Sequence, residues 1–304
     1  MLLNNSDKQK DIAVDILKNE LDVEPTTVLR FTTGYCHSVY YVKSELDEFV
    51  LRVTSEGNKW FYDGSVKWLN ELAGLDIPIP KILRHGQYEN VYYTLITYIH
   101  GKDLGEVYHA LTDLEKQEIV SELVAIQRKV ATLPVDANCC DSYLFVVNHI
   151  QRSRESIASN KIFDPSICDA VEELLGTFKK YLTEVEPTAF LSDTSTKNVL
   201  IHNGRLSGIV DIDEVDYGDP LLVVGLTNMA LLAIRADTKY IDYWLDEIQA
   251  NSAQRKIVVF YTLLFCINFM GERGTTFCNG KVVPANQDEV ELFNSIYVKL
   301  LAML

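Results

Sequence analysis

The chain has 304 residues, 47% of them hydrophobic and 23% charged, which is typical of a soluble globular protein with one large domain or two modest ones. Its formal net charge is −15, and so acidic a surface repels nucleic-acid phosphates and anionic membranes. We therefore exclude nucleic acid and membrane as partners, while cationic small molecules remain compatible with this charge.

The first hundred residues predict a small α+β unit. The stretch "DKQKDIAVDILKNEL" has the apolar spacing of a short amphipathic helix. Three runs rich in Val, Tyr, Phe and Thr then predict an antiparallel meander, at 27–34, 38–44 and 48–55. A helix is expected over 63–75, and two further strands around a turn within 77–86 and 90–101.

After residue 101 the pattern becomes helical. The first long helix begins after an N-cap at Thr112 or Asp113. Further helices are predicted at about 142–158, 164–184, 220–235, 238–250, 252–271 and 286–303. The two longest apolar stretches, "PLLVVGLTNMALLAI" and "IVVFYTLLFCINFM", are too short to span a membrane and predict buried helices. The prediction is therefore a β-rich N-lobe over 1–98, a hinge near 96–102 and a helical C-lobe over 99–304.

The cysteines and the N-terminus indicate a reducing, cytoplasmic location. None of the six cysteines has C-x-x-C or Cys/His metal spacing, so all are expected as reduced thiols. The opening "MLLNNSDKQK" lacks the apolar core of a signal peptide.

One polar hairpin interrupts the helical half, within "FLSDTSTKNVLIHNGRLSGIVDIDEVDYGDP" at 190–220. Asp193 opens a loop that ends at Asn198, and Asp211 follows the next apolar strand. A hairpin between 199–202 and 206–210 brings Asp211 back beside Asn198. Amide and carboxylate oxygens are ligands for a hard cation, so we expect Asn198 and Asp211 to bind magnesium.

This stretch resembles the aminoglycoside phosphotransferase and choline kinase family, relatives of the protein kinases. The family pattern is H-G-D-x-x-x-x-N, then I-D-x-[DE], then G-D-P. Here Asp193 and Asn198 match the first part, and "VDID" and "YGDP" match the others. The likeness extends to "EFVLRV", "IPIPKIL" and "TLITYIHGKDL", and covers most of 25–235. The resemblance implies a bilobal protein-kinase-like α+β fold, ATP and Mg²⁺ as cofactors, and phosphorylation of a small-molecule hydroxyl.

The resemblance also implies a role for each matching position. Asp193 would be the catalytic base and Arg52 would contact phosphate from the place of the family's strand lysine. Adenine would meet the hinge backbone at Ile96, Thr97 and Tyr98, and Gly34 lies in the nucleotide loop. Substrate contacts are expected from the acids that follow Asp211, namely Asp213, Glu214 and Asp216.

Four positions depart from the family pattern, and one of them is Arg52 in place of the strand lysine. Leu191 replaces the loop histidine and Ser192 its glycine, and the acid expected on the helix falls on Ser65, for which Asp63 or Glu71 could substitute. These departures favour one alternative, a nucleotide-binding pseudokinase without turnover. A protein kinase is a second alternative, opposed by the lack of an A-P-E-like segment after Asp211.

Each residue also has a simpler interpretation. Asp193 before Thr-Ser-Thr favours a local turn, Asn198 can cap the loop, and Arg52 can be a surface charge on an edge strand. For Asp213 two interpretations are equally supported, a metal or substrate ligand and a solvated loop residue. His37, His100 and His202 are expected as surface or loop histidines, and Asp219 before Pro220 as a helix cap. The combination of Asp193, Asn198 and Asp211 is what favours catalysis.

Overall fold

The computed structural model describes residues 5–31, 37–135, 141–276 and 282–304. The chain divides into two compact units, one containing Met1–His100 and Gly208–Glu214, the other Gly101–Ser207, Val215–Thr275 and Val282–Leu304. The short segment Gly208–Glu214 is tied to the first unit by the backbone hydrogen bond from Ile209 N–H to the Pro78 carbonyl, 2.8 Å long.

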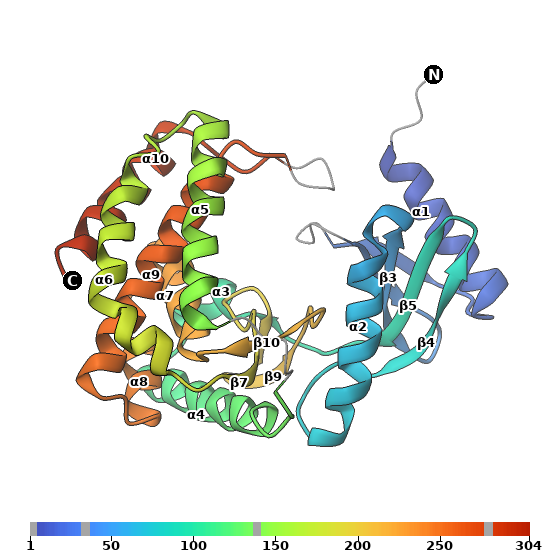
Figure 1. Ribbon diagram of the computed structural model, residues 1–304. Helices are drawn as coiled ribbons and strands as arrows, with labels where there is room; N and C mark the ends of the chain where they lie inside the picture. Colours follow the sequence, from blue (N-terminus) through green and yellow to red (C-terminus); the bar gives the residue numbers. More distant parts are fainter. Residues whose placement is uncertain (1–4, 32–36, 136–140, 277–281) are drawn as a thin grey trace. The chain divides into compact units, whose positions relative to one another are not determined.

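The first unit is an antiparallel five-stranded sheet in the order β1-β2-β3-β5-β4. Its helices are α1, which continues as a π-helical turn, and α2, which lies along the sheet in Figure 1. The bounds are α1 Asn5–Asp15, π-turn Ile16–Glu20, β1 Thr27–Arg30, β2 Ser38–Lys43, β3 Glu48–Ser55, α2 Lys59–Leu72, β4 Ile82–Tyr88 and β5 Val91–Thr97. The predicted meander and the second strand pair are confirmed.

The two faces of this sheet differ because side chains alternate along each strand. Leu51 and Val53 of β3 point into an apolar core with Ile16 and Leu17 of the π-turn. Arg52 and Thr54, between and after them, point to the opposite face, where Ser65 of α2 lies within hydrogen-bonding distance of Arg52. The period of the strand therefore places a cation opposite the core.

The second unit is mostly helical, as predicted. Its small strands form two sheets, β10-β7 and β6-β8-β9. The strands are β6 Lys102–Asp103, β7 Thr188–Leu191, β8 Val199–His202, β9 Arg205–Ile209 and β10 Val215–Gly218. Residues Asn203 and Gly204, with φ of 52° and 75°, form the turn between β8 and β9; this two-residue turn with positive φ suits the twist of a hairpin. The β7–β10 pair and β6 were not predicted.

Within the described residues after 112, the helices agree with the sequence prediction in number and order. They are α4 Asp113–Val130, α5 Ser142–Asn160, α6 Ile167–Glu184, α7 Leu221–Ala233, α8 Lys239–Glu247, α9 Ser252–Glu272 and α10 Gln287–Leu301. The short helix α3 Leu104–Val107 precedes them and was not predicted. Thr112 is the N-cap of α4 and forms a reciprocal capping box with Glu115. Figure 1 shows α5, α6, α9 and α10 gathered in one bundle.

Helix α9 forms the centre of this bundle. With 21 residues it is, within the described ranges, the one helix long and apolar enough to cross a membrane by length and composition. The prediction that this stretch is too short was therefore wrong. Its apolar side chains are largely buried against α5 and α7, however, which is typical of a core helix. Gly225 of α7 allows the close approach, because an added Cβ would lie 2.5 Å from the Cβ of Tyr261.

Buried polar groups fix the bundle to the end of β10. The Asp219 carboxylate accepts hydrogen bonds from the hydroxyls of Tyr181 and Tyr261 and from the Leu221 N–H at the start of α7. Burial raises the pKa of Asp219 above its ordinary value. Cys168 and Cys266 are buried free thiols whose pKa values are raised by burial, and Cys36, Cys139, Cys140 and Cys278 lie outside the described residues.

His149 of α5 predicts how stability depends on pH. Burial lowers its pKa from 6.5 to about 4, and its Nε2 is buried with no hydrogen-bond partner among the described residues. Between these values the unfolded chain binds more protons than the folded chain, so stability falls as pH falls from 6.5 to 4. The shift corresponds to at most about 3 kcal/mol. Urea unfolding at pH 7 and pH 4.5 should show a smaller loss of unfolding free energy between the two pH values for His149→Leu than for the parent.

The exposed His202 provides the control for this measurement. His202→Leu should keep the pH dependence of the parent protein. An equal loss of stability in the parent and in His149→Leu would contradict the role assigned to the buried imidazole.

Candidate active site

A buried cation organises the polar face of the first unit. Arg52, 5% exposed on the inner strand β3, donates from Nη2 to Asp211 Oδ1 and to Asp213 Oδ2, both at 2.9 Å. The interpretation of Arg52 as an edge-strand surface charge is therefore wrong, because β3 is paired on both sides. A buried guanidinium requires such counter-charges, since desolvation of an unpaired ion is costly.

The two aspartates differ in exposure and in backbone. Asp211 has a half-exposed side chain and a φ of 60°, a left-handed conformation that Asp and Asn adopt more readily than most residues. The side chain of Asp213 is 16% exposed. Burial alone would raise the pKa of Asp213, but the charge of Arg52 and the hydrogen bond with His37 outweigh it and hold the pKa below its ordinary value.

His37 completes the cluster, although the sequence predicted a surface histidine. It is 7% exposed, and its Nε2 lies 2.9 Å from Asp213 Oδ2 while its Nδ1 lies 2.7 Å from Thr54 Oγ1. The ring therefore links strand β3 to the segment that follows β9. Its signal was hidden, because His37 and Asp213 are 176 residues apart in the chain.

Helix α2 contributes a hydroxyl at position 65, where an acid was expected, and a glycine at position 64. Ser65 Oγ accepts a hydrogen bond from Arg52 Nη1 at 2.9 Å. Asp63, one of the acids proposed as a partner of Arg52, instead binds Lys59 at 2.6 Å. An added Cβ at Gly64 would lie 2.3 Å from the carbonyl oxygen of Asp213. The helix backbone and the 211–214 segment are thus in direct contact.

The carboxylates in this cluster suit a divalent cation. Ligand atoms of His37, Asp211 and Asp213 lie within 4.8 Å of one another. Oxygen donors fit magnesium, and the exposure of Asp211 gives a nucleotide-bound ion access to this side of the cluster. Asn198 is described within the second unit, so its pairing with Asp211 around one metal stays a prediction.

The loop from Leu191 to Asn198 is held by hydrogen bonds at several points. Asp193 is exposed, and its Oδ1 accepts from the hydroxyl of Ser195 at 2.6 Å, the local turn that the sequence also suggested. Asn198 donates its Nδ2 to the Asp193 carbonyl at 3.1 Å, so its amide oxygen is the atom suited to a cation. Gly105 N–H binds the Thr196 carbonyl at 2.8 Å.

Helix α4 holds the beginning of this loop through a residue that the sequence did not single out. Gln127 accepts from the Leu191 N–H at 3.0 Å and donates to the Leu191 carbonyl at 3.2 Å. It also lies 3.2 Å from Thr194 Oγ1. The position of Asp193 between Leu191 and Thr194 is therefore fixed from both sides.

The remaining predicted residues lie as follows. Ile96 and Thr97 end strand β5, and the Thr97 N–H already donates to the Lys81 carbonyl at 3.0 Å. Tyr98 follows the strand, and Gly34 lies outside the described residues. Glu214 is exposed, and Asp216 of β10 pairs with Phe190 of β7. The hinge contacts to adenine stay a prediction.

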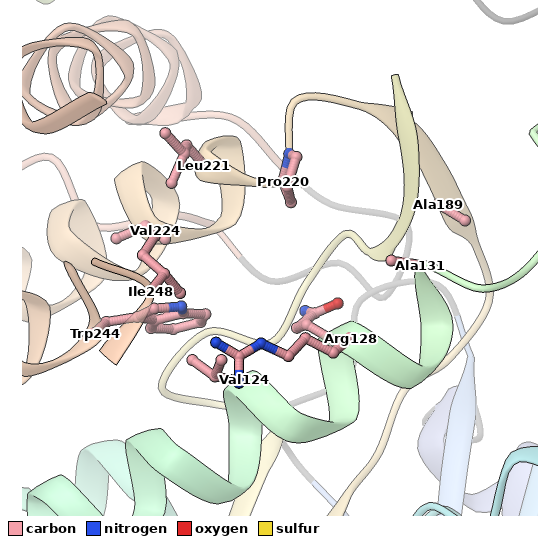
Figure 2. Close-up of a pocket in the computed structure, with 10 residues that line it drawn as sticks. Val124, Arg128, Ala131, Ala189, Pro220, Leu221, Val224, Trp244 and Ile248 are labelled. Atoms are coloured by element: carbon pink, nitrogen blue, oxygen red, sulfur yellow. The ribbon is translucent and has the colours of Figure 1, made fainter. Parts of the chain in front are cut away.

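A pocket of about 140 Å³ lies within the second unit. Figure 2 shows Val124 and Arg128 of α4 and the following Ala131 on one side, and Val224, Trp244 and Ile248 on the other. Gln127 also lines it. The lining is mainly apolar, with Arg128 as its charged group.

Comparisons with known proteins agree with this architecture. Residues 27–247 match the sequence model of the phosphotransferase enzyme family. No curated protein sequence matches the chain. Among solved structures, aminoglycoside phosphotransferase APH(2'')-Ib bound to ADP is similar with a TM-score of 0.64, at 13% identity over 96% of each chain.

Two further structures are similar to a comparable degree. A thermostable mutant of APH(4)-Ia with ADP and hygromycin B has a TM-score of 0.66, at 14% identity over 96% of this chain and 97% of that one. The gentamicin complex of APH(2")-IIa has a TM-score of 0.65, at 13% identity over 100% and 98% of the two chains. At these identities the likeness shows the fold.

The close approach at Gly64 gives a testable prediction. Alanine in place of glycine inside a helix normally stabilises it by about 1 kcal/mol. Gly64→Ala should instead destabilise the first unit by about 1–3 kcal/mol, because a Cβ would press on the Asp213 backbone. Chemical denaturation measures the difference. Gly176 of α6 is the matched control, since its added Cβ meets open space, and Gly176→Ala should not destabilise. A Gly64→Ala protein as stable as the parent would contradict the contact.

Proposed function

Because the chain belongs to the phosphotransferase enzyme family, we propose that it transfers the γ-phosphoryl group of ATP, with magnesium, to a hydroxyl group of a small molecule. The observation that carries the proposal is the Asp193 loop, which is fixed on both sides of an exposed carboxylate. The cluster of Asp211 and Asp213 around Arg52 supports it, since phosphoryl transfer requires charges placed to hold and neutralise phosphates.

Each residue has a defined part in this reaction. Asp193 would accept the proton of the substrate hydroxyl as that oxygen forms its bond to the γ-phosphorus and the bond to the bridging oxygen of ADP breaks. Asp211 and Asp213, with Asn198 as a predicted further ligand, would hold magnesium, which neutralises phosphate charge when bound. Arg52 would present positive charge to the nucleotide phosphates. The backbone of Ile96, Thr97 and Tyr98, with Gly34, would receive the nucleotide.

A cationic substrate, such as an aminoglycoside or an amino alcohol, fits the charge of the chain. The net charge is −15, and the charge of Asp213 is already balanced by Arg52. The other acids predicted to contact a substrate are Glu214, which is exposed, and Asp216. Asp216 lies on β10, beside the strand β7 that leads into the Asp193 loop. A cytoplasmic location is part of this proposal.

A panel of hydroxylated compounds tests the function. The protein would be incubated with ATP, magnesium and one compound at a time, chosen from gentamicin, hygromycin B, amino alcohols and neutral sugars. Mass spectrometry would then identify phosphorylated products. Phosphorylated cationic compounds are the expected result. Phosphorylation of neutral sugars alone would contradict the cationic substrate.

The alternative is a nucleotide-binding protein without turnover. The specific observation that favours it is the Arg52 guanidinium, which already binds the carboxylates expected to hold metal. Tight binding of magnesium-ATP without phosphorylation of any compound in the panel would favour this alternative.

The catalytic base is tested by Asp193→Asn, which keeps the shape of the side chain and removes its proton acceptor. Turnover should fall by roughly 10²–10⁴-fold while ATP affinity changes little. The exposed Asp242 of α8 offers a control, and Asp242→Asn should keep the rate of the parent. Equal turnover in Asp193→Asn and the parent would exclude Asp193 from the chemistry.

The metal assignment is tested by Asp211→Asn, which preserves a residue suited to positive φ. Loss of a carboxylate ligand should weaken ATP binding about 10-fold or more in magnesium. Calorimetry of ATP binding in EDTA separates the loss of the metal ligand from a change transmitted through Arg52, since the latter would also appear without metal. Unchanged affinity in magnesium would contradict the assignment.

A further inference from the structure

Gln127 acts on the Asp193 loop from outside it. The residue lies in the last turns of α4, 64 positions before Leu191 in the chain. Its amide oxygen accepts from the Leu191 N–H and its amide nitrogen donates to the Leu191 carbonyl, at 3.0 and 3.2 Å. A side-chain amide offers the same donor and acceptor as a peptide group. Gln127 therefore pairs with the backbone of Leu191 as a residue of a neighbouring strand would.

The third contact of Gln127 extends this hold across Asp193. Its Nε2 also lies 3.2 Å from the hydroxyl of Thr194, a side chain that is fully buried. On its other edge Leu191 is paired with Val215 of β10. The residues immediately around Asp193 are therefore anchored to a strand on one side and to a helix on the other.

The side chain at position 191 cannot supply this support itself. Leu191 is 2% exposed and has no polar atom beyond its backbone, where the resemblance led us to expect a histidine that supports the loop. We propose that Gln127 is the positioning residue that sets the Asp193 carboxylate, a role that rests on the proposed function of Asp193 as base.

Hydrogen bonds more than packing hold Gln127 in place. Gln127 lines the pocket of Figure 2, together with its neighbours Val124, Arg128 and Ala131. Open space on that side lets an apolar replacement fit without steric strain. A neutral hydrogen bond contributes only modestly to stability, whereas a misplaced catalytic group costs about 10²-fold in rate. Loss of the amide should therefore affect turnover more than folding.

The test compares Gln127→Met, which keeps the length of the side chain and removes its polar atoms, with the parent. Turnover should fall about 10- to 100-fold while the ATP dissociation constant from calorimetry stays within about 2-fold. Hydrogen exchange followed by mass spectrometry should be faster over 191–198. Gln151→Met on α5 is the matched control, since Gln151 Nε2 binds the exposed Glu155 side chain one turn away, and both readouts should match the parent.

Three further variants extend the test, and the two at Thr194 keep the proposal falsifiable if Gln127→Met folds poorly. Thr194→Val removes only the hydroxyl contact and should lower turnover, whereas Thr194→Ser retains the hydroxyl and should not. Leu191→His in the Gln127→Met background should restore part of the lost turnover, a rescue that a purely structural role for Gln127 would not give.

Unchanged turnover together with unchanged exchange over 191–198 in Gln127→Met would overturn the proposal. The exchange measurement also separates this inference from the proposed function. A parent protein without turnover would refute the kinase activity, whereas loop exchange in the same protein would still report whether Gln127 holds the loop.

Discussion

The burial of Arg52 is the constraint on which the polar face of the first unit depends. A guanidinium that is 5% exposed within a sheet cannot remain charged without partners, and arginine does not deprotonate in a protein. The structure meets this requirement by bringing the segment Gly208–Glu214 back to the sheet, so that two aspartates lie against the cation. The chain from the second half of the sequence is thus a structural part of the first unit.

The same constraint explains the small residues on α2. A segment that must reach a buried cation has to pass close to the helix, and Gly64 leaves room for its backbone. Ser65 then completes the coordination of the guanidinium with a short neutral side chain. The position to which the resemblance assigns an acid holds a neutral side chain, and the negative charges beside Arg52 come from Asp211 and Asp213. The departures at Arg52 and Ser65 are thus two parts of one arrangement.

Much of this architecture was predictable from periodicity and turn residues, and the partners of the polar groups were not. The alternation in "EFVLRV" is enough to place Arg52 opposite Leu51, and the capping residues around Thr112 locate the start of α4. His37 and Gln127 carried no such local signal, since their roles depend on contacts over 176 and 64 positions of sequence. Asp193, Asn198 and Asp211 were found because they share one short stretch with a family pattern, and their roles stay predictions until measured.

The hydroxyl at Ser65 has a consequence for control of the enzyme. In protein kinases the cation on the corresponding strand pairs with a glutamate on the helix, and displacement of that helix breaks the ion pair and silences the kinase. Here α2 gives Arg52 a neutral hydrogen bond, while its described carboxylate partners follow strand β9 in the chain. Movement of α2 would therefore leave this described charge pairing of Arg52 intact. In this respect the arrangement differs from the helix-controlled ion pair of the protein kinases.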